Sequence, residues 1–169
     1  MSYDLSFLQS NKRIKKEGIK TETSRKIPIE NEQNVGLSHD ALFEKTVLNL
    51  RNSYPELIIR NNPTDCYNCH GMTFASRRTG VYENSEVVKI LTHDSYKSIK
   101  LEDVMPGDIV IYHDPKGDPE HSGMVLSVEK SIGIIPKILS KWGMTYEAIH
   151  SVYLCPYDLQ NIVYYRCCL

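Results

Sequence analysis

The chain has 169 residues, of which 41% are hydrophobic and 24% charged, a composition that fits one globular domain with its own core. The formal net charge of −1 gives no electrostatic reason to expect binding to nucleic acid or to an anionic membrane. No apolar run approaches the roughly 20 residues that span a bilayer, and residues 1–7 are too polar for a signal peptide. We therefore expect a cytoplasmic protein, with export by a signal-independent route left open.

The five cysteines are an odd number, and a chain of this length can fold without disulfide bonds. We expect all of them to be reduced thiols. No motif in the sequence calls for a cofactor.

Residues 1–36 are predicted to form a flexible tail outside a packed domain of residues 37–169. Residues 11–16 are a basic cluster, and residues 20–33 are polar with few large apolar side chains. Such a segment buries too little apolar surface to offset the entropy lost on ordering. The basic cluster is then a solvated part of the tail, with docking to a protein partner as the alternative.

Helices are predicted in the first half of the domain. The first begins at Ser38 or Asp40 and ends before Pro55, because a residue that precedes proline disfavours helical geometry. A short apolar run at 57–59 and a loop at 61–63 lead to a second helix near Cys69. A third helix follows a cap at Ser85 and ends at 93–95. The core-facing residues of the first helix recur at helical spacing: Leu42, Phe43, Thr46, Val47 and Leu50.

The second half changes to the pattern of strands. Turn residues at 105–108 and 114–119 separate β-rich runs at 109–112, 121–128, 134–142 and 161–166, whereas residues 146–150 are interpreted as a helical turn. Helices followed by antiparallel strands indicate an α+β domain.

Cys69 lies at the predicted junction between a loop and a helix. The first N–H groups of a helix have no intrahelical acceptor and the helix dipole is positive there, so a thiolate is favoured and the thiol becomes a better nucleophile. The alternative is that Cys69 is only a small buried apolar residue.

His121 begins a predicted strand just after a turn, at the rim of the sheet. Side chains alternate along a strand, so His121 shares one face with Gly123 and Val125, and Gly123 leaves room for another backbone or a ligand. A histidine in this position can take the proton of a thiol and return it to a leaving amine.

Three segments together resemble a known family. Residues 68–72 (Asn-Cys-His-Gly-Met), 106–112 (Pro-Gly-Asp-Ile-Val-Ile-Tyr) and 121–125 (His-Ser-Gly-Met-Val) are similar to the NlpC-type and CHAP-type papain-like superfamily. The resemblance implies a papain-like α+β fold, with the helices first and packed on an antiparallel sheet. It also implies a cysteine amidase or peptidase, often one that acts on peptidoglycan peptides, without a metal. Because a secretion signal is missing, an enzyme acting on a cytosolic peptide or conjugate, or an injected toxin, fits the sequence as well.

The resemblance also implies roles for individual residues. Cys69 is the nucleophile and His121 the general base. The third member of the site is Ser140 by position, with His150 as the alternative. The oxyanion hole would use the Cys69 backbone N–H, with Asn68 or Tyr67 beside it.

Two features of the sequence depart from this picture. Asn68 stands where the family often has aspartate, and Asp65-Cys66 imitates that pair, which makes Cys66 a rival nucleophile. Cys69 is preferred because Gly71 follows it in the family's register. Trp142 is interpreted as a wall of the substrate groove, with a place in the core as its alternative.

Two other functions remain open. A structural zinc module could use Cys66, Cys69 and His70 with Cys155, Cys167 and Cys168, although no second well-spaced Cys-x-x-Cys pair is present. A catalytically inactive member of the same fold could act as a binding domain.

Overall fold

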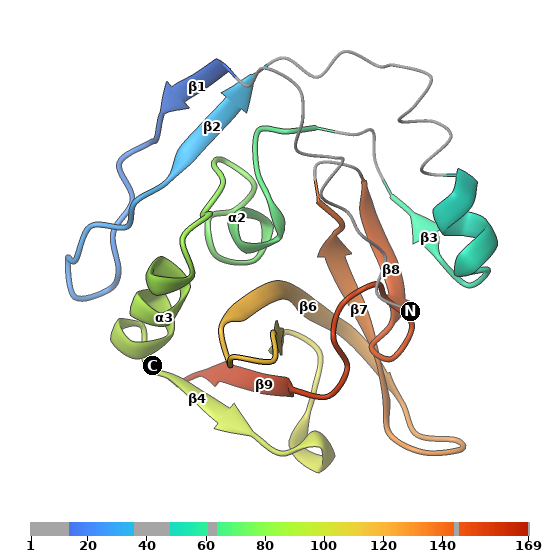
Figure 1. Cartoon of the computed structure of the whole chain (residues 1–169). Coiled ribbons are helices and arrows are strands. Elements are labelled where there is room, and N and C mark those ends of the chain that lie inside the picture. Colours follow the sequence, from blue (N-terminus) through green and yellow to red (C-terminus); the bar gives the residue numbers. More distant parts are fainter. Residues whose placement is uncertain (1–13, 36–47, 61–63, 144–145, 169) are drawn as a thin grey trace.

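The computed structural model describes residues 14–35, 48–60, 64–143 and 146–168 (Figure 1). Seven antiparallel strands form an open sheet in the order β3-β8-β7-β6-β5-β9-β4, and a separate two-stranded sheet pairs β1 with β2. Together with a few short helices, these sheets confirm the predicted α+β class. In the described part of the chain, no helix is long and apolar enough to cross a membrane.

The elements follow one another in a simple order along the chain. The helices are α2 (Cys69–Phe74), α3 (Asn84–His93) and the 3-10 helix η2 (Leu101–Asp103). The strands are β1 (Ile14–Glu17), β2 (Glu32–Val35), β3 (Ile58–Ile59), β4 (Tyr96–Ile99), β5 (Ile109–His113), β6 (Pro119–Glu129), β7 (Ile135–Lys141), β8 (Glu147–Ser151) and β9 (Ile162–Cys167).

Strands β5 to β8 form a meander in which each pairs with the next, and β9 returns to the free side of β5. The strands predicted at 109–112, 121–128, 134–142 and 161–166 are confirmed, as are the helices that begin near residues 69 and 85. The start of the first predicted helix lies outside the described residues, but residues 48–53 are helical.

Residues 146–150 were predicted as a helical turn, and this prediction is wrong. From residue 147 onward they form β8, which pairs with β7 on one side and with β3 on the other. Hydrogen bonding to strands on both sides decides the conformation here, because the local sequence has no strong preference of its own. Strand β4 was not predicted, since it is a short edge strand that pairs only with β9 among the described strands.

The two faces of the sheet carry different cores. One face is covered by α2 and α3, and the buried residues there are Ile29, Val81, Val87, Ile90 and Ile111, with a second group of Tyr67, Met72 and Leu139. The opposite face holds the largest cluster: Val104, Val110, Tyr112, Val125, Ile138, Trp142, Ala148, Val152, Cys155 and Tyr164.

The prediction of a flexible tail is wrong for residues 14–35, while residues 1–13 and 36 lie outside the described part. Strands β1 and β2 pair with each other, and Glu32 forms a bridge to Gly80. Polar contacts hold the segment in place: the Glu30 N–H donates to the Glu86 carboxylate, and the Thr79 hydroxyl donates to Asn31. The segment therefore needs little apolar surface of its own.

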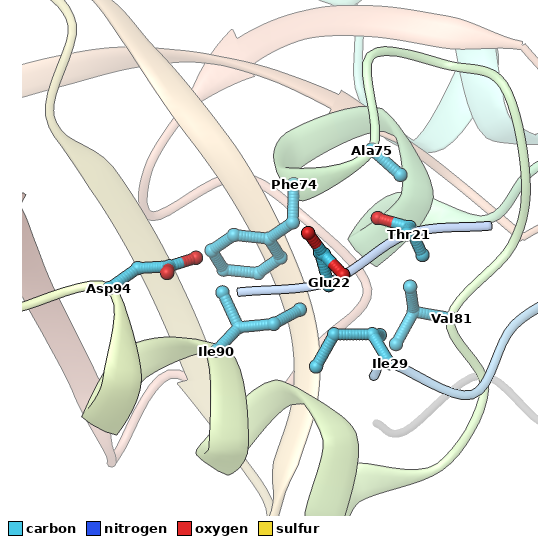
Figure 2. Close-up of a pocket in the computed structure, with 8 residues that line it drawn as sticks. All are labelled: Thr21, Glu22, Ile29, Phe74, Ala75, Val81, Ile90 and Asp94. Atoms are coloured by element: carbon cyan, nitrogen blue, oxygen red, sulfur yellow. The ribbon is translucent and has the colours of Figure 1, made fainter. Parts of the chain in front are cut away.

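Ile29 is the main apolar anchor of this segment. It is buried against Val87 and Ile90 of α3. Figure 2 shows Ile29 and Ile90 converging with Phe74 and Val81 around a small pocket, which residues 21 and 22 also line. The N-terminal segment thus closes one side of the core that α3 forms with the sheet.

We predict that Ile29→Ala lowers the free energy of unfolding by about 2–4 kcal/mol, because it opens a cavity in this core. Urea denaturation measures the change. Ile132→Ala is the matched control, because Ile132 is 85% exposed, and it should shift stability by less than about 0.5 kcal/mol. If the two variants are equally stable, residues 14–35 are a peripheral appendage after all.

Candidate active site

The Asn68 side chain fixes the start of α2. Its Oδ1 accepts hydrogen bonds from the N–H of Gly71 at 2.9 Å and from the N–H of Val81 at 3.0 Å. Its Nδ2 donates to the Val81 carbonyl. An asparagine at this position satisfies an N–H group that the helix itself cannot. Cys69 is therefore held as the first residue of the helix, as the sequence predicts.

Gly71 lets the next segment of chain pass close to the same helix. A Cβ at this position would lie 1.9 Å from the carbonyl oxygen of Thr79. Any side chain would force α2 away from residues 79–81, and the contacts between Asn68 and Val81 would be lost. The glycine is thus required by the packing beside the cysteine.

A chain of buried hydrogen bonds ties α2 to strand β6. His70 Nδ1 lies 2.9 Å from Ser122 Oγ, the Ser122 hydroxyl donates to Thr73 Oγ1 at 3.0 Å, and the Thr73 hydroxyl donates to the Cys69 carbonyl at 3.0 Å. Burial lowers the pKa of His70 to about 4, although a hydrogen bond with the Pro119 backbone opposes this shift. His70 is therefore neutral and structural near pH 7.

His121 precedes Ser122 on β6, so its side chain leaves the strand on the opposite side, toward Tyr112, with which it pairs across β5 and β6. The imidazole is fully buried, at 0% exposure. Its ring stacks on the ring of Tyr157 with centroids 3.7 Å apart and planes 8° apart. His121 thus lies between the sheet and the segment that joins β8 to β9.

The β6–β7 ladder begins at Gly123 and Ser140, and a Cβ at Gly123 would lie 2.9 Å from the Leu139 carbonyl. The close backbone expected at Gly123 is therefore strand β7. Before this point β6 meets Cys69, and the backbone of Ser122 is hydrogen-bonded to the cysteine. The Cys69 sulfur therefore lies near His121, at the beginning of β6.

Cys69 and His121 perturb each other's titration. Burial alone would raise the pKa of the Cys69 thiol, but the charge of a protonated His121, the polar contact with its ring, and hydrogen bonding by the backbone of Ser122 and His70 outweigh it and lower that pKa. Burial lowers the pKa of His121, and a thiolate at Cys69 only partly opposes this effect. A protonated His121 thus favours the thiolate at Cys69, and a thiolate at Cys69 favours the protonated ring.

Cys69 and His121 are neighbours, but no hydrogen bond of normal geometry joins the sulfur to the ring. Among the residues that the structure describes, neither ring nitrogen of His121 has a hydrogen-bond partner. Cys69 is 8% exposed, so its sulfur is nearly buried beside the ring. Catalytic hydrogen bonds are often long in a free enzyme and tighten when substrate binds.

Ser140 and His150, the two candidates for a third member of the site, bond to each other. Ser140 Oγ lies 2.8 Å from His150 Nε2, and His150 Nδ1 lies 2.8 Å from the Ser151 carbonyl. The Nδ1–H therefore donates to that carbonyl, and Nε2 accepts from the serine. Burial lowers the pKa of His150 to about 4, which keeps the ring neutral.

Trp142 belongs to the core on the face of the sheet opposite α2 and α3. It is buried, its Nε1–H donates to Ser140 Oγ at 3.0 Å, and its ring meets that of Tyr54 edge-on at 5.2 Å. These contacts match the alternative expectation for this tryptophan, a place in the core, and differ from a groove wall.

Tyr67 and Asn68, expected near an oxyanion hole, have their polar groups engaged elsewhere. The Tyr67 hydroxyl donates to Glu147 Oε1 at 2.8 Å, and the Asn68 amide is used in the helix cap. The backbone N–H of Cys69, at the first helical position, has no acceptor within α2 and is therefore available as a donor to a substrate oxygen.

A charged cluster that the sequence analysis did not select lies beside the cysteine. Glu147 forms an ion pair with Arg77, and the Lys141 ammonium lies 5.1 Å from the centre of the Tyr67 ring. Burial lowers the pKa of Lys141 to about 8, against the opposing influence of Glu147 and Cys69. The cluster places a buried cation close to the thiol.

The remaining cysteines give little support to a zinc site. Cys155 is buried, with its thiol 3.9 Å from the Val152 carbonyl, whereas Cys66, Cys167 and Cys168 are exposed. In the described ranges, no three His, Cys, Asp or Glu side chains are grouped so that they could hold a metal ion.

We predict a loss of stability in mild acid from His70 and His150. Both have a pKa of about 4 in the folded protein, whereas an unfolded histidine titrates near 6.5. The unfolded chain then binds more protons between these values, so their stabilisation is complete above about pH 6.5 and declines toward about pH 4. The expected loss from about pH 7.5 to about pH 5 is on the order of 2 kcal/mol per histidine.

Urea denaturation at both pH values measures this loss, and the slope against pH should be smaller in His150→Gln. An unfolding free energy that stays constant over this range would contradict the buried neutral state of both rings.

Comparison with known proteins adds nothing to this geometry: no family model matches the chain, and neither a curated protein nor a solved structure is significantly similar to it.

Proposed function

We propose that this protein is a cysteine hydrolase that cleaves an amide or peptide bond with Cys69 as nucleophile and His121 as general base. One observation carries the proposal: the Cys69 thiol lies at a capped helix N-terminus beside a buried histidine, and its pKa is lowered. Thiols with these features are nucleophilic near neutral pH.

The first half of the reaction would form a thioester. His121 takes the proton of the Cys69 thiol, and the sulfur attacks the carbonyl carbon of the substrate. The negative charge that develops on the carbonyl oxygen is stabilised by the Cys69 backbone N–H and the dipole of α2. The C–N bond then breaks as the imidazolium of His121 gives its proton to the leaving amine.

The second half would release the acid. His121, neutral again, takes a proton from a water molecule whose oxygen attacks the thioester carbonyl. The C–S bond breaks, the carboxylic acid departs, and the proton returns from His121 to the Cys69 sulfur. Lys141, a buried cation near the sulfur, favours the thiolate at both stages.

Within the α+β class, the order of elements along the chain supports a papain-like architecture of the NlpC or CHAP type. The cysteine begins a helix that precedes the sheet in the chain, and the histidine lies near the start of β6 in a meander. The substrate would then be a peptide amide, either a peptidoglycan peptide or a cytosolic peptide or conjugate, in a cytoplasmic enzyme without a cofactor. The exposed location of Cys66 supports Cys69 over its rival.

The alternative of a catalytically inactive binding domain is favoured by a different observation. The His121 ring is fully covered, and in the described structure neither of its nitrogens has a hydrogen-bond partner of normal geometry. A catalytically inactive protein with the same fold would show the same buried ring. A measurement of activity therefore separates the hydrolase from the binding domain.

We predict that Cys69→Ala lowers hydrolysis at least about 10³-fold and that His121→Ala loses nearly as much, because nucleophile and base act as one unit. Cys66→Ala is the matched control and should retain most activity. The measurement is turnover of a mixture of peptides and peptidoglycan fragments, followed by mass spectrometry, with the variants matched in folding.

Undiminished turnover by Cys69→Ala would remove this cysteine from the mechanism. Loss of activity in Cys66→Ala alone would transfer the role of nucleophile to Cys66. If the native protein cleaves nothing in the mixture and Cys69 reacts no faster than an ordinary thiol, the binding domain is the better description.

A further inference from the structure

The imidazole of His121 belongs to a cluster of three aromatic rings. The Tyr157 ring lies parallel to it at 3.7 Å, whereas Tyr112 is tilted by 45° at 5.6 Å and lies 6.1 Å from Tyr157. A parallel ring at van der Waals distance restricts rotation of the imidazole about its χ2 angle, because rotation would drive the rings into each other.

The usual way to orient a catalytic histidine is a hydrogen bond from a third polar residue. The two candidates for that role, Ser140 and His150, bond to each other, and the remaining nitrogen of His150 is used by Ser151. In the described structure both nitrogens of the fully buried His121 ring are without a hydrogen-bond partner. The stacking contact is therefore the most specific restraint on the ring.

Tyr157 is itself anchored on both sides. A hydrogen bond joins its phenolic oxygen to the backbone of Gly143. In its own segment, Val152 and Cys155 are buried in the core, and the Val152 carbonyl accepts a hydrogen bond from the Tyr112 hydroxyl at 3.1 Å. These contacts make Tyr157 a fixed platform although it lies between two strands.

We infer that Tyr157 is the positioning residue of the site: its ring holds the plane of His121 for proton transfer with Cys69, in place of a hydrogen-bonding third residue. This inference rests on the proposed function, because it gives His121 its role as base. A flat aromatic face also tolerates the imidazolium that forms during the reaction, since a cation is attracted to a π system.

Several titratable groups face His121 and shape its protonation. Cys69 and His70 come from α2, His150 from β8, Tyr112 from β5, and Tyr157 from the segment between β8 and β9. A thiolate at Cys69 favours the protonated ring, whereas His70 and His150 disfavour it. Only Tyr157 can be replaced without altering a residue of a helix or strand.

The test compares Tyr157→Leu, which keeps apolar volume but removes the flat ring, with Tyr157→Phe, which keeps the ring. Tyr153→Leu is the control, since Tyr153 is an exposed residue of the same segment. The first readout is the rate at which iodoacetamide modifies Cys69 as a function of pH, with the labelled residue mapped by mass spectrometry.

We expect Tyr157→Leu to lower the rate at about pH 6.5 by roughly tenfold or more, since a displaced base loses its effect on the thiol. Tyr157→Phe and Tyr153→Leu should stay within about twofold of the native rate. Where a substrate is known, kcat should follow the same order with KM little changed.

A native rate in Tyr157→Leu would overturn the inference, and so would an equal loss in Tyr157→Phe, which would assign the effect to the hydroxyl. The native protein offers a second test that needs no variant to fold. The His121 ring protons should show an upfield ring-current shift by NMR, and ordinary chemical shifts would refute the stack.

These readouts keep the inference separate from the proposed function. A Cys69 reactivity that depends on the Tyr157 ring supports the positioning role even if no amide is cleaved. An active hydrolase whose Cys69 ignores Tyr157 would keep the proposed function and remove the positioning role.

Discussion

The hydrogen bonds of the Asn68 side chain are the constraint on which the rest of the site depends. One amide oxygen caps α2 at Gly71 and also holds Val81, and the amide nitrogen completes the contact with Val81. The cap sets where the helix begins, and the helix start sets where the Cys69 sulfur lies. A capping side chain contributes about 1 kcal/mol to stability, but its larger effect here is positional.

A second constraint is burial, which acts on both members of the proposed catalytic pair. Burial disfavours the charged form of each, so it raises the pKa of a thiol and lowers that of an imidazole. For Cys69 the charge of His121 and backbone hydrogen bonds prevail, while for His121 burial prevails. The result is a thiol that gives up its proton most readily when the neighbouring imidazole takes it.

Much of the scaffold could be predicted from the sequence, because local signals dictate it. The turn residues of 105–108 and 114–119 delimit the strands that follow, and the helix near Cys69 is predicted from the loop-like sequence that precedes it. The N-terminal segment was misjudged because its polar side chains bond to distant partners, such as Glu30 with Glu86. Strand β8 was missed because neighbouring strands on both sides decide its conformation.

The site was predictable only in part, and for a related reason. Cys69 and His121 carry their chemistry in their residue types and in their places at a helix start and a strand start. Tyr157 and Lys141 carry no such local signal, since their places arise only when the segment after β8 folds onto His121 of β6 and when β7 brings Lys141 to Tyr67. Similarly, Ser140 and His150 were predicted as alternatives for one role, and the hydrogen bond between them was not predicted.

The most direct test of the activation of Cys69 by His121 compares the reactivity of all five cysteines in the native protein. An alkyne-tagged vinyl sulfone, added in limiting amount at about pH 6, is followed by mass-spectrometric mapping. Exposure alone favours Cys66, Cys167 and Cys168, whereas the lowered pKa of the buried Cys69 favours its labelling at this pH. We predict that Cys69 is labelled first and that folded His121→Ala loses this preference. Labelling in order of exposure, with Cys69 last, would contradict it.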